Sequence, residues 1–444
     1  MAARRLIGQE LESSMPSEFD VGALLKPISI NKLTIANRMV LGPMAAIEPN
    51  PDGTASDQTV AFFDRRARGG VGMIIVGGSA STTRSVEEAM VKTVLRFDID
   101  TTIASLKRIT AAVHAHDVPI IAELTAGFGP MGVPGPGRPN IAASAVKVVI
   151  PEKRFPRGMI VPGGRTTPTP EPATVQEIRQ IEREMIDSAV RAKRAEFDGV
   201  EVAAHMSYLA ASFLSPRTNQ RTDEYGGSAE NRARMLSNVV AGIRKECGAD
   251  FVIGLRLAAN DLMPGGQGAR GFAEVARHVE AAGLDYVALS YGCYETMDAS
   301  APAEDGGMID SGDARVFKEA LRVPVLVQGV HDPVNAAAAI REGHGDLVMW
   351  ARPMLADPDL PRKVAENRLG EIVKCRRDNY CIRRMVFGMP VRCEANREMG
   401  RESRAGGSFP PVERMLKRPV ESVVLGVTGS AGVMKVLGSL KKPG

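Results

Sequence analysis

Eight short apolar runs recur along the chain, and each is separated from the next by a longer stretch with helical periodicity. The runs are almost wholly apolar, which is typical of parallel strands buried on both faces. They lie at residues 38–44, 73–76, 119–124, 199–203, 251–257, 286–290, 324–328 and 347–350. Eight strands alternating with helices predict an α/β fold, a (β/α)₈ TIM barrel. An open doubly wound sheet is the alternative, and the lack of a glycine-rich dinucleotide turn after the first run disfavours it.

The intervening stretches carry helix signals. Thr174 and Glu177 form a capping box that opens an amphipathic helix reaching about residue 196. Further helices are expected at residues 233–245, 273–282, 313–321 and 333–342. Residues 127–172, after the third strand, are rich in glycine and proline, and we expect no regular structure there. Because function in such barrels lies at the carboxyl ends of the strands, this stretch is predicted to cover the mouth of the site. A surface excursion without a role is the alternative.

Composition narrows the class of protein. The net charge of +4 comes from 56 basic and 52 acidic residues mixed along the chain, which argues against a nucleic-acid partner. No apolar run is long enough for a membrane span, and residues 1–20 read as a flexible extension without a secretory signal. Five cysteines in 444 residues do not make a disulfide framework, so reduced thiols and a cytoplasmic location are expected.

Several long motifs occur in order at the ends of the predicted strands. They are LTIANRMVLGPM at 33–44, FDGVEV at 197–202, FLSPRTNQRTDEYGGSAENRARM at 213–235, VPVLVQGVHDP at 323–333 and GDLVMWARPMLADPDL at 345–360. Together they resemble the old yellow enzyme family of NADH:flavin oxidoreductases. GCYETMDA at 292–299 is similar to the branch containing 2,4-dienoyl-CoA reductases and bile-acid-inducible enoate reductases. The resemblance implies that residues 21–370 bind FMN and use NAD(P)H to reduce an activated C=C bond of an unsaturated carbonyl compound or acyl-CoA.

The resemblance also implies where the flavin ring lies. Pro43, Met44 and Ala45 are expected along the ring edge, with Gly78 close by. Arg256 is expected to stabilise negative charge on N1 and O2 of the reduced flavin.

The phosphate of the flavin is expected on the loops after strands seven and eight, at Gly329, Ala351 and Arg352. An ordinary surface cation is the alternative for Arg352.

Glu123 departs from the family, which usually has glutamine there. A carboxylate can donate a hydrogen bond only when it is protonated, so weaker flavin binding or a shifted potential is expected.

The substrate side departs from the family too. Ala203 and Met206 stand where a pair of histidines, or a histidine and an asparagine, usually binds the activating carbonyl. His205 is one residue out of phase, and a packed histidine is the favoured interpretation over a substrate ligand. Tyr208 falls on the position of the tyrosine acid of the dienoyl-CoA reductase branch, and Tyr294 is a second candidate proton donor.

Residues 371–404 resemble the iron–sulfur segment of that branch. Cys375, Asp378, Cys381 and Cys393 follow the spacing C-x₂-D-x₂-C-x₁₁-C, with aspartate in place of the usual second cysteine. Three interpretations stay open: a [4Fe–4S] cluster with aspartate as a ligand, a labile cluster lacking one ligand, and no cluster. Cys247 and Cys293 are read as ordinary thiols.

Residues 405–444 are predicted to be a tail. Residues 420–432 look like the first strand and turn of a nucleotide-binding domain, and the tail is interpreted as a remnant of that domain. A separate reductase is therefore an expected partner, besides further copies of the chain.

Two other functions stay open. One is an amine-oxidising or demethylating flavoenzyme, and the other is a flavin-binding paralogue of low activity, which the departures at residues 123, 203, 206 and 378 favour.

Overall fold

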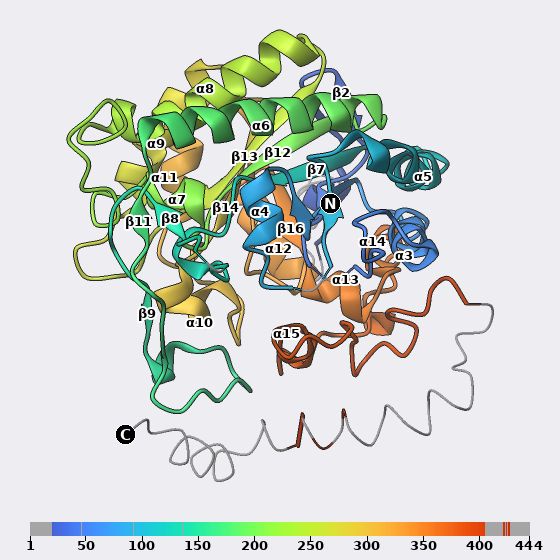
Figure 1. Ribbon diagram of the computed structural model, residues 1–444. Helices are drawn as coiled ribbons and strands as arrows, with labels where there is room; N and C mark the ends of the chain where they lie inside the picture. The colour runs from blue at the N-terminus through green and yellow to red at the C-terminus, as the bar shows by residue number, and fades with distance from the viewer. Residues whose placement is uncertain are drawn as a thin grey trace, which may run out of the picture.

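The computed structural model describes residues 20–404 except 46, 92 and 136, together with residues 421, 423, 425 and 426. Eight parallel strands close into a barrel in the order β3, β4, β7, β12, β13, β14, β15, β16 (Figure 1). The predicted (β/α)₈ barrel is therefore confirmed. Each strand begins within one residue of the run that predicted it, and the ends agree as well except for β3, which ends three residues early at Leu41. The strands are β3 Met39–Leu41, β4 Met73–Val76, β7 Ile120–Thr125, β12 Gly199–Ala204, β13 Val252–Ala258, β14 Tyr286–Ser290, β15 Val325–Val327 and β16 Leu347–Trp350.

Helices surround this barrel (Figure 1). The capping box predicted for the longest one is present, since Thr174 Oγ1 accepts from the Glu177 amide and Glu177 bonds back to the Thr174 amide. The other predicted helices are also present, with ends shifted by up to four residues because capping residues such as Ser228 lie outside the apolar pattern. The main helices are α3 Asp57–Ala67, α5 Ile103–His114, α6 Val175–Arg194, α8 Ala229–Cys247, α9 Ala269–Ala281, α11 Asp313–Ala320 and α12 Pro333–Arg341.

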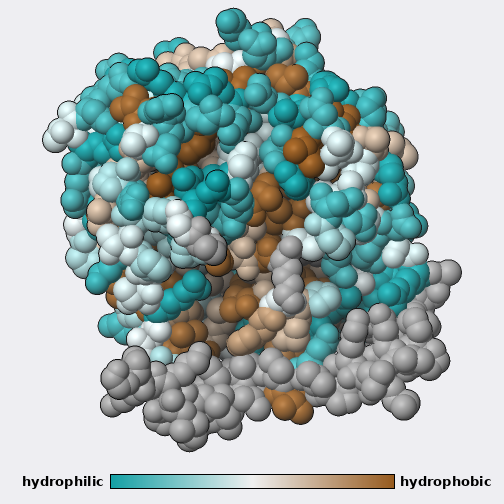
Figure 2. Space-filling view, in the orientation of Figure 1, coloured by the Kyte–Doolittle hydropathy of each residue, from teal (hydrophilic) through white to brown (hydrophobic). Residues whose placement is uncertain are grey.

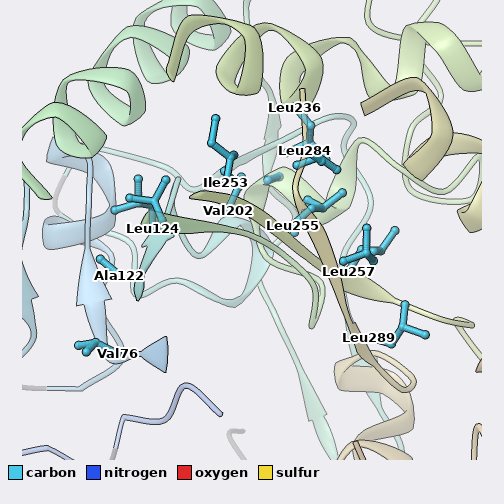
Figure 3. Close-up of a cluster of buried hydrophobic side chains, with 14 of the residues drawn as sticks. Val76, Ala122, Leu124, Val202, Leu236, Ile253, Leu255, Leu257, Leu284 and Leu289 are labelled. Carbon is cyan, nitrogen blue, oxygen red and sulfur yellow. The ribbon is translucent and has the colours of Figure 1, made fainter. Parts of the chain in front are cut away.

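The strands are buried on both faces. Their outward side chains pack against the helices, as Figure 3 shows for Val202, Leu255 and Leu236 of α8. The inward side chains form a second apolar cluster that fills the amino-terminal half of the barrel. An antiparallel hairpin of β1 (Ile28–Ile30) and β2 (Leu33–Ile35) adds side chains to this cluster.

The stretch 127–172 has more regular structure than expected. Two-residue strands form two small ladders, in which β8 (Ile141–Ala142) pairs with β11 (Glu171–Pro172) and β9 (Val149–Ile150) pairs with β10 (Arg165–Thr166). Met131, Val148 and Ile150 form a cluster with Phe155 and with Tyr208 and Tyr294, which follow β12 and β14. The stretch therefore covers the carboxyl ends of these strands.

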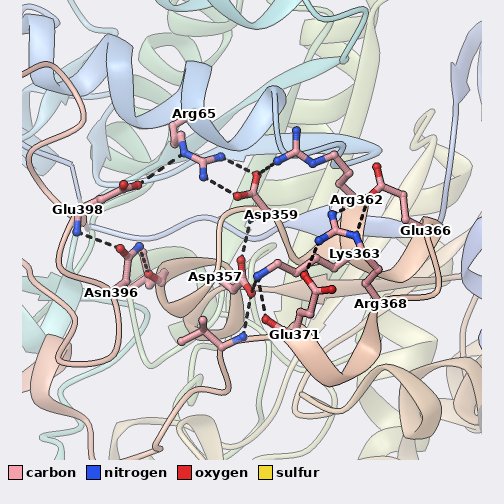
Figure 4. A network of polar contacts seen from close by, with 12 residues as sticks. Arg65, Asp357, Asp359, Arg362, Lys363, Glu366, Arg368, Glu371, Asn396 and Glu398 are labelled. Carbon is pink, nitrogen blue, oxygen red and sulfur yellow. Dashed lines mark hydrogen bonds and ion pairs between the residues drawn. The ribbon is translucent and has the colours of Figure 1, made fainter. Parts of the chain in front are cut away.

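The segment after the barrel is tied to it by ion pairs (Figure 4). Arg65 of α3 binds Asp359 at 2.6 Å and lies 3.9 Å from Glu398. Asp357 binds Lys363 at 2.7 Å and accepts from the Val373 amide at 2.8 Å. This network reaches Val373 and Glu398, which lie on either side of α15 (Tyr380–Val386) in the chain.

The predictions for the two ends of the chain lie mostly outside the described residues. Asp20 alone of residues 1–20 is described, and Glu421, Val423, Leu425 and Gly426, which have helical backbone, are the described part of the tail. Within the described ranges, no helix combines the length and the apolar character that a bilayer crossing needs.

Candidate functional site

The ends of β3 and β4 meet closely. Pro43, Met44 and Ala45 follow β3, and Gly78 follows β4 with φ +71°. A Cβ atom on Gly78 would lie 2.9 Å from the Cα of Ala45, and one on Gly77 would lie 2.6 Å from the Met44 nitrogen. Only glycine permits this approach, so the residues predicted along the ring edge are brought together at one point of the barrel mouth.

A buried charge cluster lies inside the same end of the barrel. Arg256 Nη1 on β13 donates to Glu123 Oε1 on β7 at 3.3 Å, and Arg256 Nη2 donates to Gln328 Oε1 at 3.4 Å. His205 Nε2 lies 3.7 Å from the same Glu123 oxygen. The side chains of Glu123, His205 and Arg256 are each about one-tenth exposed. Arg256 Nε is buried and has no hydrogen-bond partner among the described residues.

The surroundings of Glu123 and His205 determine which of these two groups is charged. Burial alone would raise the pKa of Glu123, but His205 and Arg256 together hold it below its ordinary value. Burial and the neighbouring Arg256 charge lower the pKa of His205 to about 4. At neutral pH the cluster therefore holds a carboxylate, a guanidinium and a neutral imidazole.

Two phenols stand beside this cluster. Tyr208 Oη and Tyr294 Oη are 3.1 Å apart, although the residues lie 86 positions apart in the chain. The Tyr208 ring packs edge-on against Phe128 at 5.2 Å and against His205 at 5.6 Å. Burial raises the pKa of both phenols, well above its ordinary value in the case of Tyr208. Both therefore keep their protons at neutral pH.

The backbone between His205 and Tyr208 has an uncommon shape. Met206 and Ser207 both have left-handed conformations, with φ of 56° and 58°. Such backbone is unusual for residues other than glycine and is found at functional sites. The turn leaves His205 packed inside the barrel mouth, where its Nδ1 has no hydrogen-bond partner among the described residues. His205 is thus buried in contact with the charge cluster, and its role towards a substrate stays a prediction.

The predicted phosphate end has an open cradle. Gly329 has φ +91°, and the nearest atom to a Cβ built there is 3.8 Å away. Arg352 follows Ala351, but its guanidinium donates to Asn379 Oδ1 at 2.8 Å and to the Pro302 carbonyl at 3.1 Å. Arg352 is therefore no free surface cation, and its side chain faces residues 371–404, the cysteine segment.

Cys375, Asp378, Cys381 and Cys393 line one cavity, together with Arg352. The three thiols are free, and burial raises the pKa of Cys381 to about 12. Among the described residues, no three histidine, cysteine, aspartate or glutamate side chains are arranged to hold a metal ion. The structure thus brings the residues expected as cluster ligands to one cavity.

The sequence analysis missed three residues of the site. Gln328 was included in the seventh strand without a role, and Phe128 was treated only as part of a loop. Glu201 lies inside the GVEV run and is fully buried. The signal available in the sequence was a carboxylate among apolar residues.

A further opening is lined by Ala45 and Gly78 on the barrel and by Met385 and Val391 of residues 371–404. Figure 2 shows apolar side chains gathered in the middle of the same face as Figure 1.

Comparisons with known sequences agree with this architecture. A family model described as the NADH:flavin oxidoreductase / NADH oxidase family matches residues 23–371. The NADH oxidase of Thermoanaerobacter brockii is 33% identical over 423 residues, which cover 93% of this chain and 61% of that protein. The cinnamate reductase of Clostridium sporogenes is 32% identical over 410 residues, which cover 86% and 59%. The chain spans roughly three-fifths of the length of these relatives.

Solved structures give the same fold. The complex of 2-naphthoyl-CoA reductase with 2-naphthoyl-CoA has a TM-score of 0.77 and 28% identity, covering 88% of this chain and 59% of that one. Histamine dehydrogenase from Rhizobium sp. 4-9 has a TM-score of 0.72 and 25% identity, covering 86% and 53%. The family match confirms the resemblance that the strand-end motifs indicated. The chain therefore belongs to the NADH:flavin oxidoreductase / NADH oxidase family, which includes the old yellow enzymes.

Proposed function

We propose that this chain uses FMN and NADH to reduce the activated C=C bond of an unsaturated carbonyl compound or acyl-CoA. The observation that carries the proposal is the pair of hydrogen-bonded phenols, Tyr208 and Tyr294, beside the buried Arg256–Glu123 pair at the barrel mouth. Such a site combines a positive charge for a reduced cofactor with neutral proton donors for a substrate.

The residues at both ends of the site fit FMN. Arg256 Nε is buried and has no hydrogen-bond partner in the described part of the chain, so it can donate to the pyrimidine side of a flavin. The space beside Gly329 is open, and the backbone there can approach a phosphate. When bound, FMN supplies the hydride that it has taken from NADH. Glu123 accepts hydrogen bonds rather than donating them, so it lowers the stability of a negatively charged reduced flavin compared with the usual glutamine.

The chain's own part in the reduction is proton transfer and polarisation. As hydride reaches the β-carbon of the substrate, negative charge develops on the carbonyl oxygen and the α-carbon. Tyr208 donates its phenol proton to this system, and Tyr294 donates a hydrogen bond to the phenolate oxygen that forms. The raised pKa of Tyr208 keeps this proton in place until the substrate carries charge. His205 is neutral and packs against the Tyr208 ring, so it holds that ring in position.

The direction of electron flow tests the proposal. FMN-loaded protein is reduced anaerobically with NADH, and its visible spectrum is followed after addition of cinnamate, cinnamoyl-CoA or histamine. The proposal predicts that NADH bleaches the flavin and that an unsaturated acid or thioester restores its colour. If histamine bleaches the oxidised flavin and no unsaturated compound re-oxidises the reduced one, the chain is an amine dehydrogenase, as its likeness to histamine dehydrogenase permits. A flavin that NADH does not bleach indicates a paralogue of low activity.

We further propose that the cysteine segment binds a [4Fe–4S] cluster through Cys375, Cys381 and Cys393, with Asp378 as the fourth ligand. Support comes from the shared cavity that these side chains line and from the suitability of thiolates for such clusters. Iron and acid-labile sulfide are measured in anaerobically purified protein and in the variants Asp378→Cys and Asp378→Ala. We expect about four irons per chain, retention in the cysteine variant and loss in the alanine variant. Equal iron in Asp378→Ala and wild type would contradict the role of Asp378.

A further inference from the structure

The least expected group in the barrel is the carboxyl group of Glu201. Its side chain is fully buried on β12, and its register neighbours are Glu123 on β7 and Gly254 on β13. Neighbouring residues in parallel register point to the same side of a sheet, so the two carboxyl groups lie in adjacent positions of the barrel interior. Of the two, Glu201 is the more deeply buried.

Tyr286 on β14 reaches over the intervening strand β13 to Glu201 on β12. Its Oη donates to Glu201 Oε2 at 2.9 Å. The ring passes over Gly254, where an added Cβ would lie 2.1 Å from the ring carbon Cζ. A side chain at residue 254 would thus block this contact. The other oxygen, Oε1, is buried and has no hydrogen-bond partner among the described residues.

The charges around Glu201 do not balance if both carboxyl groups are ionised. The titratable groups acting on it are Arg256 from β13, Glu123 from β7 and Tyr286 from β14. The strands β3, β4, β15 and β16 contribute only uncharged side chains. His205 above Glu123 is neutral. One guanidinium therefore serves two carboxyl groups, and it contacts Glu123 directly.

A buried carboxylate with one unpartnered oxygen and no cation in contact is costly, whereas a neutral carboxylic acid in the same place costs far less. The ionised form would leave a charged oxygen, Oε1, without any donor in the described residues. Burial, the first cause of the shift, and the Glu123 charge raise the pKa of Glu201 to about 8, against the lowering effect of Arg256. Geometry and charge thus agree on the protonated form.

We propose that Glu201 is a positioning residue that stays a neutral carboxylic acid in the resting protein, leaving the whole charge of Arg256 to Glu123 and to the cofactor. Loss of this proton in alkaline solution adds a second negative charge next to Glu123 and draws Arg256 towards Glu201. The acidity of one buried side chain then limits the pH range in which a reduced flavin is stabilised. This consequence for the flavin rests on the proposed function, whereas the protonation state of Glu201 does not.

Infrared spectroscopy of the whole protein tests the protonation state directly. The carbonyl stretch of a protonated carboxylic acid is separate from the carboxylate bands, and we expect it at pH 6.5 in wild type and not in Glu201→Gln. The band should fade as the pH is raised through about 8. Tyr286→Phe is the second variant, in which the band should persist and shift because its hydrogen-bond donor is gone. Burial raises the pKa of Glu88, Glu182 and Asp261 as well, so the Glu201 band is taken from the difference between the spectra of wild type and Glu201→Gln. A difference spectrum without such a band overturns the proposal.

The flavin provides the second readout. The midpoint potential of bound FMN is measured against pH for wild type, Glu201→Gln and the matched variant Glu123→Gln, which removes an ionised neighbour. Glutamine mimics the neutral acid, so the curves of wild type and Glu201→Gln should separate only above pH of about 8, with wild type falling more steeply. Glu123→Gln should differ from wild type at every pH. Equal displacement of both variants at pH 6.5 overturns the proposal. Failure to bind FMN, with the acid band present, counts against the proposed function alone.

Discussion

Breaking the Arg256–Glu123 pair should destabilise the barrel strongly, because the two charges are buried together. In Arg256→Met the side chain keeps much of its apolar length, but Glu123 is left as an uncompensated buried carboxylate. At the observed 3.3 Å, and with an effective dielectric constant of about 20, the attraction amounts to about 5 kcal/mol. Removing one partner of a buried pair typically costs about 3–5 kcal/mol, and we expect a loss of that size in the free energy of unfolding.

A double-mutant cycle separates the pair from its surroundings. Glu123→Gln, Arg256→Met and the double variant are unfolded in urea without flavin, and Trp350 fluorescence follows the transition. Trp350 is the single tryptophan of the chain and is 1% exposed on β16, so its emission reports on the barrel itself. We expect a coupling energy of about 3–5 kcal/mol, with the double variant more stable than Arg256→Met. A coupling below about 1 kcal/mol, typical of exposed pairs, would refute the buried-pair account.

Three further predictions concern single side chains. Tyr208→Phe should lower the rate of C=C reduction by about 10²–10⁴-fold while NADH still bleaches the flavin, and Tyr294→Phe should lower that rate less. Stopped-flow kinetics of both half-reactions check this, and a normal rate in Tyr208→Phe would exclude Tyr208 as the proton donor. Wild type should lose stability relative to Glu201→Gln as the pH rises from about 4.5 to about 8, because the folded state retains a proton that the unfolded state releases. Melting temperatures of the two proteins across this range check this prediction, and parallel curves would count against it. Thr174→Ala should lower the free energy of unfolding by about 0.5–2 kcal/mol through loss of the α6 cap, whereas Thr174→Ser should lower it less. Urea unfolding measures both, and an unchanged midpoint in the alanine variant would show that the cap is dispensable.

The barrel strands were predictable because each is a short apolar run, and burial on both faces leaves a simple signal in the sequence. The ladders within residues 127–172 were not predictable, since strands of two residues such as Ile141–Ala142 are too short to show a period. Helix ends shifted for a related reason. A cap such as Ser228 belongs to the polar flank rather than to the apolar stripe.

The site was only partly predictable. Tyr208 followed from its motif, but its contact with Tyr294 joins two loops that only the closed barrel brings together. His205 was judged from its register alone, and the left-handed backbone at Met206 and Ser207 has no sequence signal in residues other than glycine. Glu201 was missed because its run reads as a buried strand, and its partner Tyr286 comes from a strand 85 residues away.

Isotope tracing of the product tests the central claim most directly. The FMN-loaded protein reduces cinnamate or cinnamoyl-CoA with unlabelled NADH in D₂O, and mass spectrometry and NMR locate the deuterium. Hydride delivered from the cofactor to the β-carbon and a proton delivered from Tyr208 to the α-carbon predict a saturated product with deuterium at the α-carbon, formed far more slowly by Tyr208→Phe. The absence of any saturated product from either compound, under conditions in which NADH bleaches the flavin, would contradict the account.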